Sequence, residues 1–329
     1  MRFVIYGAGG VGGVIGAQLF KGGEDVVLIA RGAHLTAVQR DGLHLQTPAL
    51  DERLAIPAVE HPSQVAAHPD NVFILTCKSQ HTRGALEDLR ATHGDQVAVV
   101  CGQNGVVNER AALRRFARVY AMLIYLPAQM IDPGHIQCHA KRSYGVLDVG
   151  RYPGSVDGVC RELARRLEAV NFSVRPDPHV MRLKYAKLLS NLNNALDAIT
   201  SKGPGYEALR SAACTEGEAC LRAAGIEWAS AEDIEQRLKD VYEHGEIPGA
   251  TRVGGSSRQS LLRGTGDIEA DYLNGEIVQL GRLHDVPTPV NSVLQRLAVD
   301  LALRKAQPGS IDIETVQRLV EAERSAQRR

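Results

Sequence analysis

The chain begins with the apolar run Arg2-Phe3-Val4-Ile5-Tyr6, and Gly7-Ala8-Gly9-Gly10-Val11-Gly12 follows it directly. A strand, a G-x-G-x-x-G motif and a helical pattern in this order are typical of a dinucleotide-binding βαβ unit. In such a unit Gly7 lets the chain turn sharply, Gly9 lets a pyrophosphate approach the backbone, and Gly12 lets the helix pack against the strand. The alternative is an ordinary tight turn, because the motif alone is weak evidence. We predict that residues 7–12 hold a dinucleotide.

The residue after the second predicted strand indicates which dinucleotide is bound. Strand 25–29 runs into Arg31, a cation at the place where an acidic side chain would hydrogen-bond the ribose of NAD. An arginine there can bind the 2′-phosphate of NADP, whereas a carboxylate would repel it. The sequence therefore predicts NADP (NADPH) as the cofactor, against the alternative of a solvated arginine in a loop. His34, nearby in sequence, is interpreted as a surface histidine.

Composition excludes several classes of protein. With 329 residues, 44% of them hydrophobic and 23% charged, the chain is long enough for two domains with their own cores. Lys and Arg total 38, as do Asp and Glu, so no net charge attracts nucleic acid or an anionic membrane. We expect a small-molecule substrate and neither a nucleic-acid nor a membrane partner.

Apolar stretches and cysteines point to a cytoplasmic protein. The longest apolar stretch, residues 119–131, contains Pro127 and is shorter than the ~20 residues that span a bilayer. The six cysteines show no C-x-x-C motif and no zinc-ligand spacing to histidine. We therefore expect free thiols, no metal site and a cytoplasmic location.

Strand and helix patterns alternate in the first half of the chain. Apolar runs predict strands at 2–6, 25–29, 72–77, 97–101 and 119–126. Helical patterns between several of them predict an α/β fold with a Rossmann-type doubly wound sheet. Residues 135–149 are interpreted as an antiparallel extension of that sheet. A helix at 158–170 and a short strand at 172–174 are expected to follow.

Two prolines in Arg175-Pro176-Asp177-Pro178 mark a boundary, because they continue neither a helix nor a strand. Beyond it, helical patterns cover residues 179–201, 206–225, 230–244, 267–284 and 289–305. We predict a dinucleotide-binding domain at 1–177 and an all-helical C-terminal domain at 178–329. The charged tail, 321–329, is expected to be frayed.

Two loops at predicted strand ends carry polar groups that suit a ligand. Lys78 follows one strand, and Asn104 follows another within Gln103-Asn104-Gly105. Open α/β sheets bind ligands at this edge, where an ammonium suits an anion and an amide suits a carboxamide or a substrate oxygen. The alternatives are a solvated lysine and a common Asn-Gly turn.

A polar face on the first helix of the second domain is the next candidate. At about 100° per residue, Lys187, Asn191 and Asn194 fall on one narrow face. Asparagine is unfavourable inside a helix, so these amides are interpreted as serving a purpose beyond helix formation. The alternative is a solvated polar face.

Together these features resemble the ketopantoate reductase (2-dehydropantoate 2-reductase) family over nearly the whole chain. The residues that carry the resemblance are Gly7, Gly9, Gly12, Arg31, Lys78, Gln103-Asn104-Gly105, Lys187, Asn191, Ser256-Ser257 and Glu269-Ala270-Asp271-Tyr272-Leu273-Asn274-Gly275. The resemblance implies a Rossmann domain, a helical domain with the substrate and catalytic groups, and NADPH-dependent reduction of 2-dehydropantoate to pantoate in pantothenate biosynthesis. It further implies that Lys187 is the general acid, that Lys78 lies near the cofactor, and that Asn104, Asn191, Ser257 and Glu269 line the site. We also expect Asn104 to contact the cofactor and Asn194 to contact the substrate.

Elementary chemistry agrees with these roles. Negative charge grows on the carbonyl oxygen as hydride reaches the keto carbon, and an ammonium within about 3 Å can stabilise it and deliver a proton. Lys187 suits this role. A nearby carboxylate raises a lysine's pKa, so we expect Glu269 to position the lysine, ribose or substrate hydroxyl. The alternative for Glu269 is a surface carboxylate early in a helix.

Departures from the family pattern fall on the substrate side. Gly254 replaces the usual asparagine before the Ser pair, Ala195 replaces the second helical asparagine, and Arg258 replaces an apolar residue. Gly266 and Ile268 replace the usual Arg and Thr. Arg258 is therefore a candidate for a substrate carboxylate. Another 2-keto acid, an opine-type or 2-hydroxy-acid dehydrogenase, and a non-catalytic NADPH-binding regulator remain as alternatives, as does a homodimer.

Overall fold

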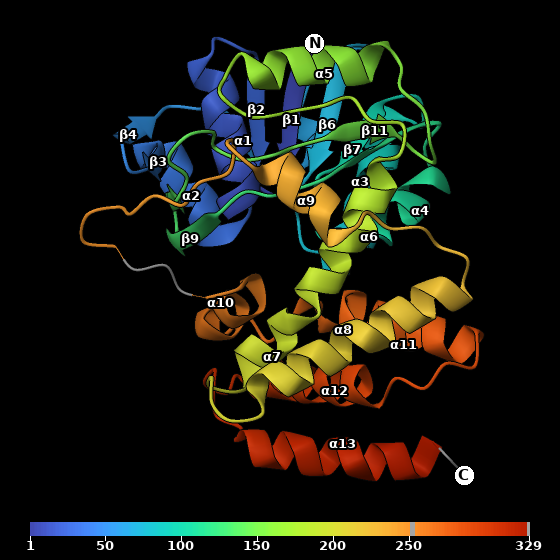
Figure 1. The fold of residues 1–329 in the computed structure, drawn as a ribbon. Helices are drawn as coiled ribbons and strands as arrows, with labels where there is room; N and C mark the ends of the chain where they lie inside the picture. The colour runs from blue at the N-terminus through green and yellow to red at the C-terminus, as the bar shows by residue number, and fades with distance from the viewer. Residues whose placement is uncertain (251–253, 328–329) are drawn as a thin grey trace. The chain divides into compact units, whose positions relative to one another are not determined.

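The computed structural model describes residues 1–250 and 254–327, and this part of the chain divides into two compact units. One comprises Met1–Lys184 with residues 230–250, and the other comprises Tyr185–Ala229 with residues 254–327. The first is an α/β unit and the second is helical (Figure 1). The predicted fold class is thus confirmed, while the domain boundary at 177 and 178 stays a prediction.

A seven-stranded sheet forms the centre of the first unit, in the order β11-β8-β7-β6-β1-β2-β5 (Figure 1). Its strands are β1 (Arg2–Tyr6), β2 (Val26–Ile29), β5 (Ala58–Val59), β6 (Asn71–Leu75), β7 (Ala98–Cys101), β8 (Arg118–Met122) and β11 (Val149–Arg151). All neighbours are parallel except β11 and β8. The order changes direction between β1 and β6, which is where such sheets bind ligands. The five predicted strands are confirmed with shifted ends.

A second, four-stranded sheet was not expected from the sequence. Its order is β4-β3-β10-β9, with β4 (Asp51–Leu54), β3 (Leu43–Gln46), β10 (His135–Cys138) and β9 (Ala128–Asp132). The prediction that 135–149 extends the main sheet is therefore wrong for β10, and only β11 does so. The physical reason is that Ile136 packs against the small residues of the first helix, near Gly13. Residues 172–174 form only an isolated bridge, through Ser173.

Side chains of β1 alternate between two cores on opposite faces of the main sheet. Phe3 and Ile5 lie in one apolar cluster with residues of α1 (Gly10–Lys21) and α5 (Gly158–Glu168). Val4 and Tyr6 lie in another with residues of α3 (Thr82–His93). The unit's remaining helices are α2 (Gly32–Asp41), α4 (Asn108–Leu113) and α9 (Ala231–Leu238), with 3-10 turns at Pro62–Gln64 and Ser79–His81. Helices cover both faces of the sheet, and loops lie at the carboxyl ends of its strands.

The second unit consists of helices, and between its two segments the chain passes through residues 230–250 of the first unit (Figure 1). They are α6 (Val180–Asn191, which begins in the first unit), α7 (Asn193–Ile199), α8 (Tyr206–Ala223), α10 (Ser256–Arg263), α11 (Asn274–Leu283), α12 (Pro289–Leu303) and α13 (Ile313–Gln327). The prediction of a single helix at 179–201 is wrong, because the helix is divided at Leu192. The carbonyl of Leu192 accepts a hydrogen bond from Asn274 Nδ2 at 3.0 Å. A 3-10 turn, Glu269–Tyr272, precedes α11.

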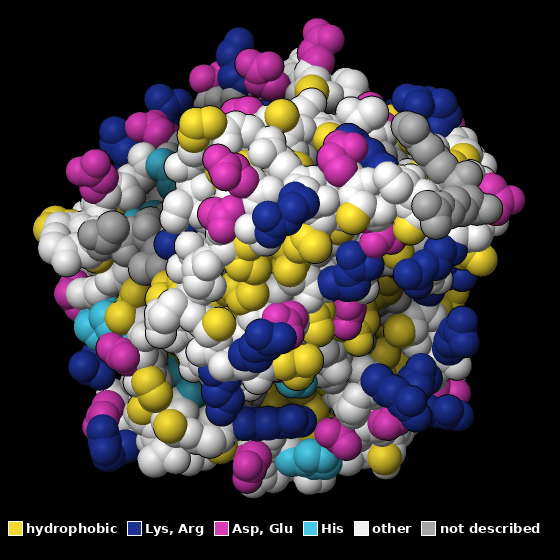
Figure 2. Space-filling view, turned by 90° about the horizontal axis from the view of Figure 1, so that it is seen from below, with side chains coloured by type: hydrophobic (Ala, Val, Ile, Leu, Met, Phe, Trp, Pro, Cys, Tyr) yellow, Lys and Arg dark blue, Asp and Glu magenta, His cyan; other side chains and the backbone are white. Residues whose placement is uncertain are grey.

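The charged tail is helical as far as Gln327, which corrects the expectation of fraying within the described residues. Ile313, Val316 and Val320 are buried at helical spacing, and their burial stabilises α13. None of the helices in residues 1–250 and 254–327 is long and apolar enough to cross a membrane. Figure 2 shows one face of the molecule, where acidic and basic side chains are interspersed among hydrophobic ones, as the balanced composition leads us to expect. All six cysteines are free thiols.

Candidate functional site

The glycine-rich loop is a tight turn with open space beside Gly9. Gly7 has φ of +105°, and a Cβ there would lie 2.5 Å from the Cys77 nitrogen. A Cβ on Gly12 would collide with the Gly7 carbonyl oxygen, whereas one on Gly9 would meet nothing within 4 Å among the described residues. The backbone at Gly9 is thus open, and no described side chain caps the N-terminus of α1 there. These N–H groups can bind an anion.

His34 braces this loop, which corrects its interpretation as a surface histidine. The ring is half-buried, Nδ1 accepts a hydrogen bond from the Gly134 N–H at 2.9 Å, and Nε2 lies 2.8 Å from the Ala8 carbonyl oxygen. Because Nδ1 is an acceptor, the proton is on Nε2, which donates to Ala8. Burial lowers the pKa of His34. The ring links the loop to the turn between β9 and β10, a role that sequence spacing could not reveal.

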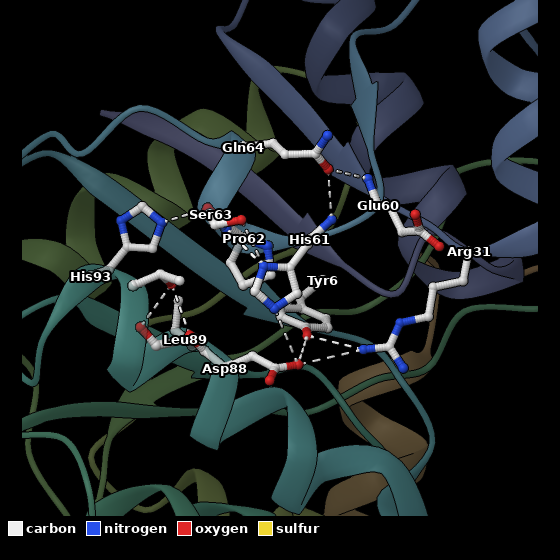
Figure 3. Close-up of polar contacts among 11 residues, drawn as sticks. Tyr6, Arg31, Glu60, His61, Pro62, Ser63, Gln64, Asp88, Leu89 and His93 are labelled. Atoms are coloured by element: carbon white, nitrogen blue, oxygen red, sulfur yellow. Dashed lines mark hydrogen bonds and ion pairs between the residues drawn. The ribbon is translucent and has the colours of Figure 1, made fainter.

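Arg31 lies just beyond β2, as predicted, and its side chain is 59% exposed. Figure 3 shows its guanidinium beside Tyr6 and Asp88. Arg31 Nη2 donates to the Tyr6 hydroxyl at 3.3 Å and lies 3.6 Å from Asp88 Oδ2. Burial and the charge of Asp88 raise the pKa of Tyr6 to about 12. Arg31 is therefore exposed at the carboxyl end of β2, and one side of its guanidinium contacts the Tyr6 hydroxyl and the Asp88 carboxylate.

A hydrogen-bonded network joins the two polar loops of the first unit. Gln103 Nε2 donates to the Cys77 carbonyl at 2.7 Å and to Thr82 Oγ1 at 2.8 Å. Lys78 and Asn104, the residues predicted from the sequence, are half-buried beside these anchors in the chain. The network therefore restrains the backbone on which both candidates sit, and their contacts with a cofactor stay predictions.

A buried ion pair that the sequence did not reveal supports the second of these loops. Lys184 Nζ lies 2.6 Å from Glu109 Oε1, with the side chains 3% and 0% exposed. The same ammonium donates to the carbonyl of Gln103 at 2.9 Å and, at longer range, to those of Cys101 and Met122. Burial, together with the charge of Glu109, raises the pKa of Cys101 well above its usual value. These bonds offset the cost of burying the ammonium.

Lys187 and Asn191 both lie in the last turns of α6, as predicted. Lys187 is half-buried, and Asn191 is 7% exposed. Asn191 Nδ2 has no hydrogen-bond partner within residues 1–250 and 254–327. Asn194 belongs to α7, which the single residue Leu192 separates from α6, and its role toward a substrate stays a prediction.

Ser257 and Glu269, the other polar candidates of the helical unit, are buried. Ser257 is 2% exposed, and its Oγ has no hydrogen-bond partner in the described parts of the chain. Glu269 begins the 3-10 turn and lies near Arg263, whose pKa is lowered by burial and raised again by Asp267 and Glu269. Glu269 is thus a buried carboxylate, unlike the surface alternative considered for it.

Two departures from the family pattern are physically linked. Gly254 has φ of +52°, and a Cβ there would lie 2.6 Å from Arg258 Cδ. Arg258 Nη1 donates to the Asp197 carbonyl at 3.0 Å. The arginine stem therefore fills the space that an asparagine at position 254 would need, and one nitrogen of its guanidinium is already bonded to the protein.

Family models match both halves of the chain. Residues 3–154 match the model of the family described as ketopantoate reductase PanE/ApbA, and residues 179–301 match that of its C-terminal domain. A 2-dehydropantoate 2-reductase of Halobacterium salinarum is 30% identical over 312 residues, covering 92% of this chain and 99% of its own. That of Pyrococcus horikoshii is 27% identical, covering 90% and 96%.

Solved structures show the same similarity. A PanE/ApbA family ketopantoate reductase from Ralstonia eutropha JMP134 has a TM-score of 0.78 and 29% identity, covering 93% of this chain and 99% of its own. A D-mandelate dehydrogenase in complex with NADH and anilino(oxo)acetate has a TM-score of 0.76, with the same coverage. At 21% identity the latter shows the fold alone. The two family models together span most of the chain, which therefore belongs to the ketopantoate reductase family of oxidoreductases.

Proposed function

We propose that this protein reduces a 2-keto acid to the 2-hydroxy acid with NADPH, with 2-dehydropantoate as substrate. The observation that carries the proposal is that two candidate substrate residues of the helical unit, Asn191 and Ser257, each have a buried polar atom without a hydrogen-bond partner in the described chain, Nδ2 and Oγ respectively. Both are buried, and a buried polar atom without a hydrogen bond among residues 1–250 and 254–327 costs about 1–3 kcal/mol unless a ligand supplies one. A carboxylate and a hydroxyl group are suitable partners.

The first unit supplies the cofactor half of this proposal. The open backbone at Gly9 and the uncapped start of α1 fit the pyrophosphate, and exposed Arg31 fits the 2′-phosphate. Lys78 and Asn104 follow neighbouring parallel strands and would lie toward the nicotinamide end. The bound nicotinamide supplies hydride.

Lys187 supplies the proton in the proposed reaction. Its ammonium stabilises the negative charge that grows on the carbonyl oxygen and then donates a proton to that oxygen, which leaves a hydroxyl group and a neutral amine. Asn191 lies one helical turn further on, and in the proposed reaction it orients a substrate oxygen. Glu269 positions the lysine or a substrate hydroxyl.

The altered pair Gly254 and Arg258 favours a second candidate, a related 2-keto acid. A site that lacks the amide that would hydrogen-bond a substrate hydroxyl is less selective for substrates with that hydroxyl. The same chemistry on a 2-hydroxy acid or an opine-type substrate runs in the oxidative direction, whereas a regulator would bind NADPH without turnover.

A screen of 2-keto acids with NADPH separates these functions. Loss of the absorbance of reduced cofactor is measured with 2-dehydropantoate and with analogues that lack its hydroxyl or carry a second carboxylate. The proposal predicts the highest kcat/KM for 2-dehydropantoate. A higher value for an analogue would select the second candidate, and NADPH binding without turnover of any acid would contradict both.

A further inference from the structure

A carboxylate stands beside the arginine proposed to recognise the 2′-phosphate. Asp88 projects from α3, and three groups from other elements approach its Oδ2 (Figure 3). The Tyr6 hydroxyl lies 3.3 Å away, Arg31 Nη2 3.6 Å and His61 Nε2 3.7 Å. Asp88 is thus the shared anion of a small cluster at the carboxyl ends of β1, β2 and β5.

The protons on Tyr6 and His61 determine which groups in this cluster donate and which accept hydrogen bonds. Tyr6 keeps its proton, because burial and Asp88 raise its pKa to about 12, so it accepts from Arg31 and donates to Asp88. His61 Nδ1 accepts from the Ser63 N–H at 3.2 Å, which leaves Nε2 as the ring N–H that faces Asp88. One edge of the Arg31 guanidinium therefore already faces an anion.

We infer that Asp88, acting through Arg31, limits how strongly this protein prefers NADPH to NADH. This inference rests on the proposed binding of NADPH at Arg31. A 2′-phosphate must share the guanidinium with the Asp88 carboxylate and is repelled by it at short range. The neutral 2′-hydroxyl of NADH feels no such repulsion. Asp88 is accordingly a specificity-determining residue that need not touch the cofactor.

The test is a double-mutant cycle of binding constants. The Kd values of NADPH and NADH are measured by titration calorimetry for the wild type, D88N, R31Q and the double variant R31Q/D88N. We expect D88N to lower the Kd of NADPH about threefold to tenfold and to leave that of NADH within about twofold. In the R31Q background the same change should alter the Kd of NADPH by less than about twofold.

Controls separate a local effect from a general one. E87Q removes the neighbouring carboxylate on α3, which pairs with Arg83 and Arg115, and should leave both Kd values unchanged. D88S gives a second neutral replacement, and circular dichroism establishes that each variant is folded. A wild type that binds neither dinucleotide would contradict the proposed function itself. A wild type that binds both, with D88N and D88S leaving the ratio of the two Kd values unchanged or shifting it toward NADH, would overturn the inference alone. Equal effects with and without Arg31 would also overturn it.

Discussion

Arg31 and His34 of the first unit differ from Asn191 and Ser257 of the second in how their polar atoms are bonded. Around the glycine-rich loop, the protein itself supplies the partners, since His34 bonds to Ala8 and Arg31 to Tyr6 and Asp88. In the helical unit, Asn191 Nδ2 and Ser257 Oγ are buried without a partner in the described chain. We propose that Arg31 and the glycine-rich loop are positioned before a ligand binds, whereas Asn191 and Ser257 gain their hydrogen bonds from the ligand.

The largest expected effect concerns Lys187, the proposed acid. K187A should lower kcat about 10²–10⁴-fold, the range for a positioned general acid, with little change in the Kd of NADPH. Steady-state kinetics and calorimetry measure the two quantities. K202A, at an exposed lysine of the same unit, is the matched control and should keep wild-type kinetics. A folded K187A protein with near-normal turnover would eliminate this mechanism.

Arg31 tests the cofactor half of the comparison. R31D removes the charge-assisted bond to the 2′-phosphate and places a second carboxylate beside Asp88, so the KM for NADPH should rise about tenfold or more. The KM for NADH should stay nearly constant. R83D, at an exposed arginine of α3, is the control for charge alone. Equal losses with both cofactors would mean that Arg31 only stabilises the fold.

Gly254 and Arg258 test whether the altered substrate side is a coupled pair. G254N alone should lower the free energy of unfolding by about 1–3 kcal/mol, because the new side chain meets the stem of Arg258. Adding R258A, which removes the stem beyond Cβ, should recover most of the loss, and thermal or urea unfolding measures both. If the double variant is no more stable than G254N, the two sites are independent.

His34 gives the smallest effect, a pH dependence. Burial lowers its pKa in the folded protein, so the unfolded chain binds more protons below its reference pKa of about 6.5. The stability that depends on neutral His34 is present above that value and is lost as the pH falls through the folded pKa. Urea unfolding between pH 7.5 and 5 should show a shallower decline for H34Q than for the wild type. His135 has the same sign and remains in both proteins, so parallel curves would refute the role of His34.

Local patterns in the sequence account for most of the fold. Five strands of the main sheet and the glycine-rich turn follow from short apolar runs and from residues that only a tight turn needs. The second sheet could not be predicted, because β3 and β10 pair across some ninety residues and carry mixed polar and apolar side chains. The break at Leu192 also depends on a distant residue, Asn274.

The candidate site residues also divide into those with a local sequence signal and those that depend on distant partners. Arg31 and Lys187 are predicted from their place at a strand end and on a helix face; the structure has both positions, and their roles stay predictions. Asp88, His61 and the ion pair of Lys184 with Glu109 were missed, because each acts only through partners from other elements. No spacing in the sequence signals such a contact.

One calorimetric experiment tests most directly whether Asn191 and Ser257 bind the keto acid without contributing to the binding of NADPH. NADPH and 2-dehydropantoate are titrated separately into the wild type and into N191A/S257A, with 2-dehydropantoate added in the presence of oxidised cofactor. The account predicts that the Kd of the keto acid rises about tenfold or more, while that of NADPH changes less than about twofold. A folded double variant that binds the keto acid as tightly as the wild type would contradict it.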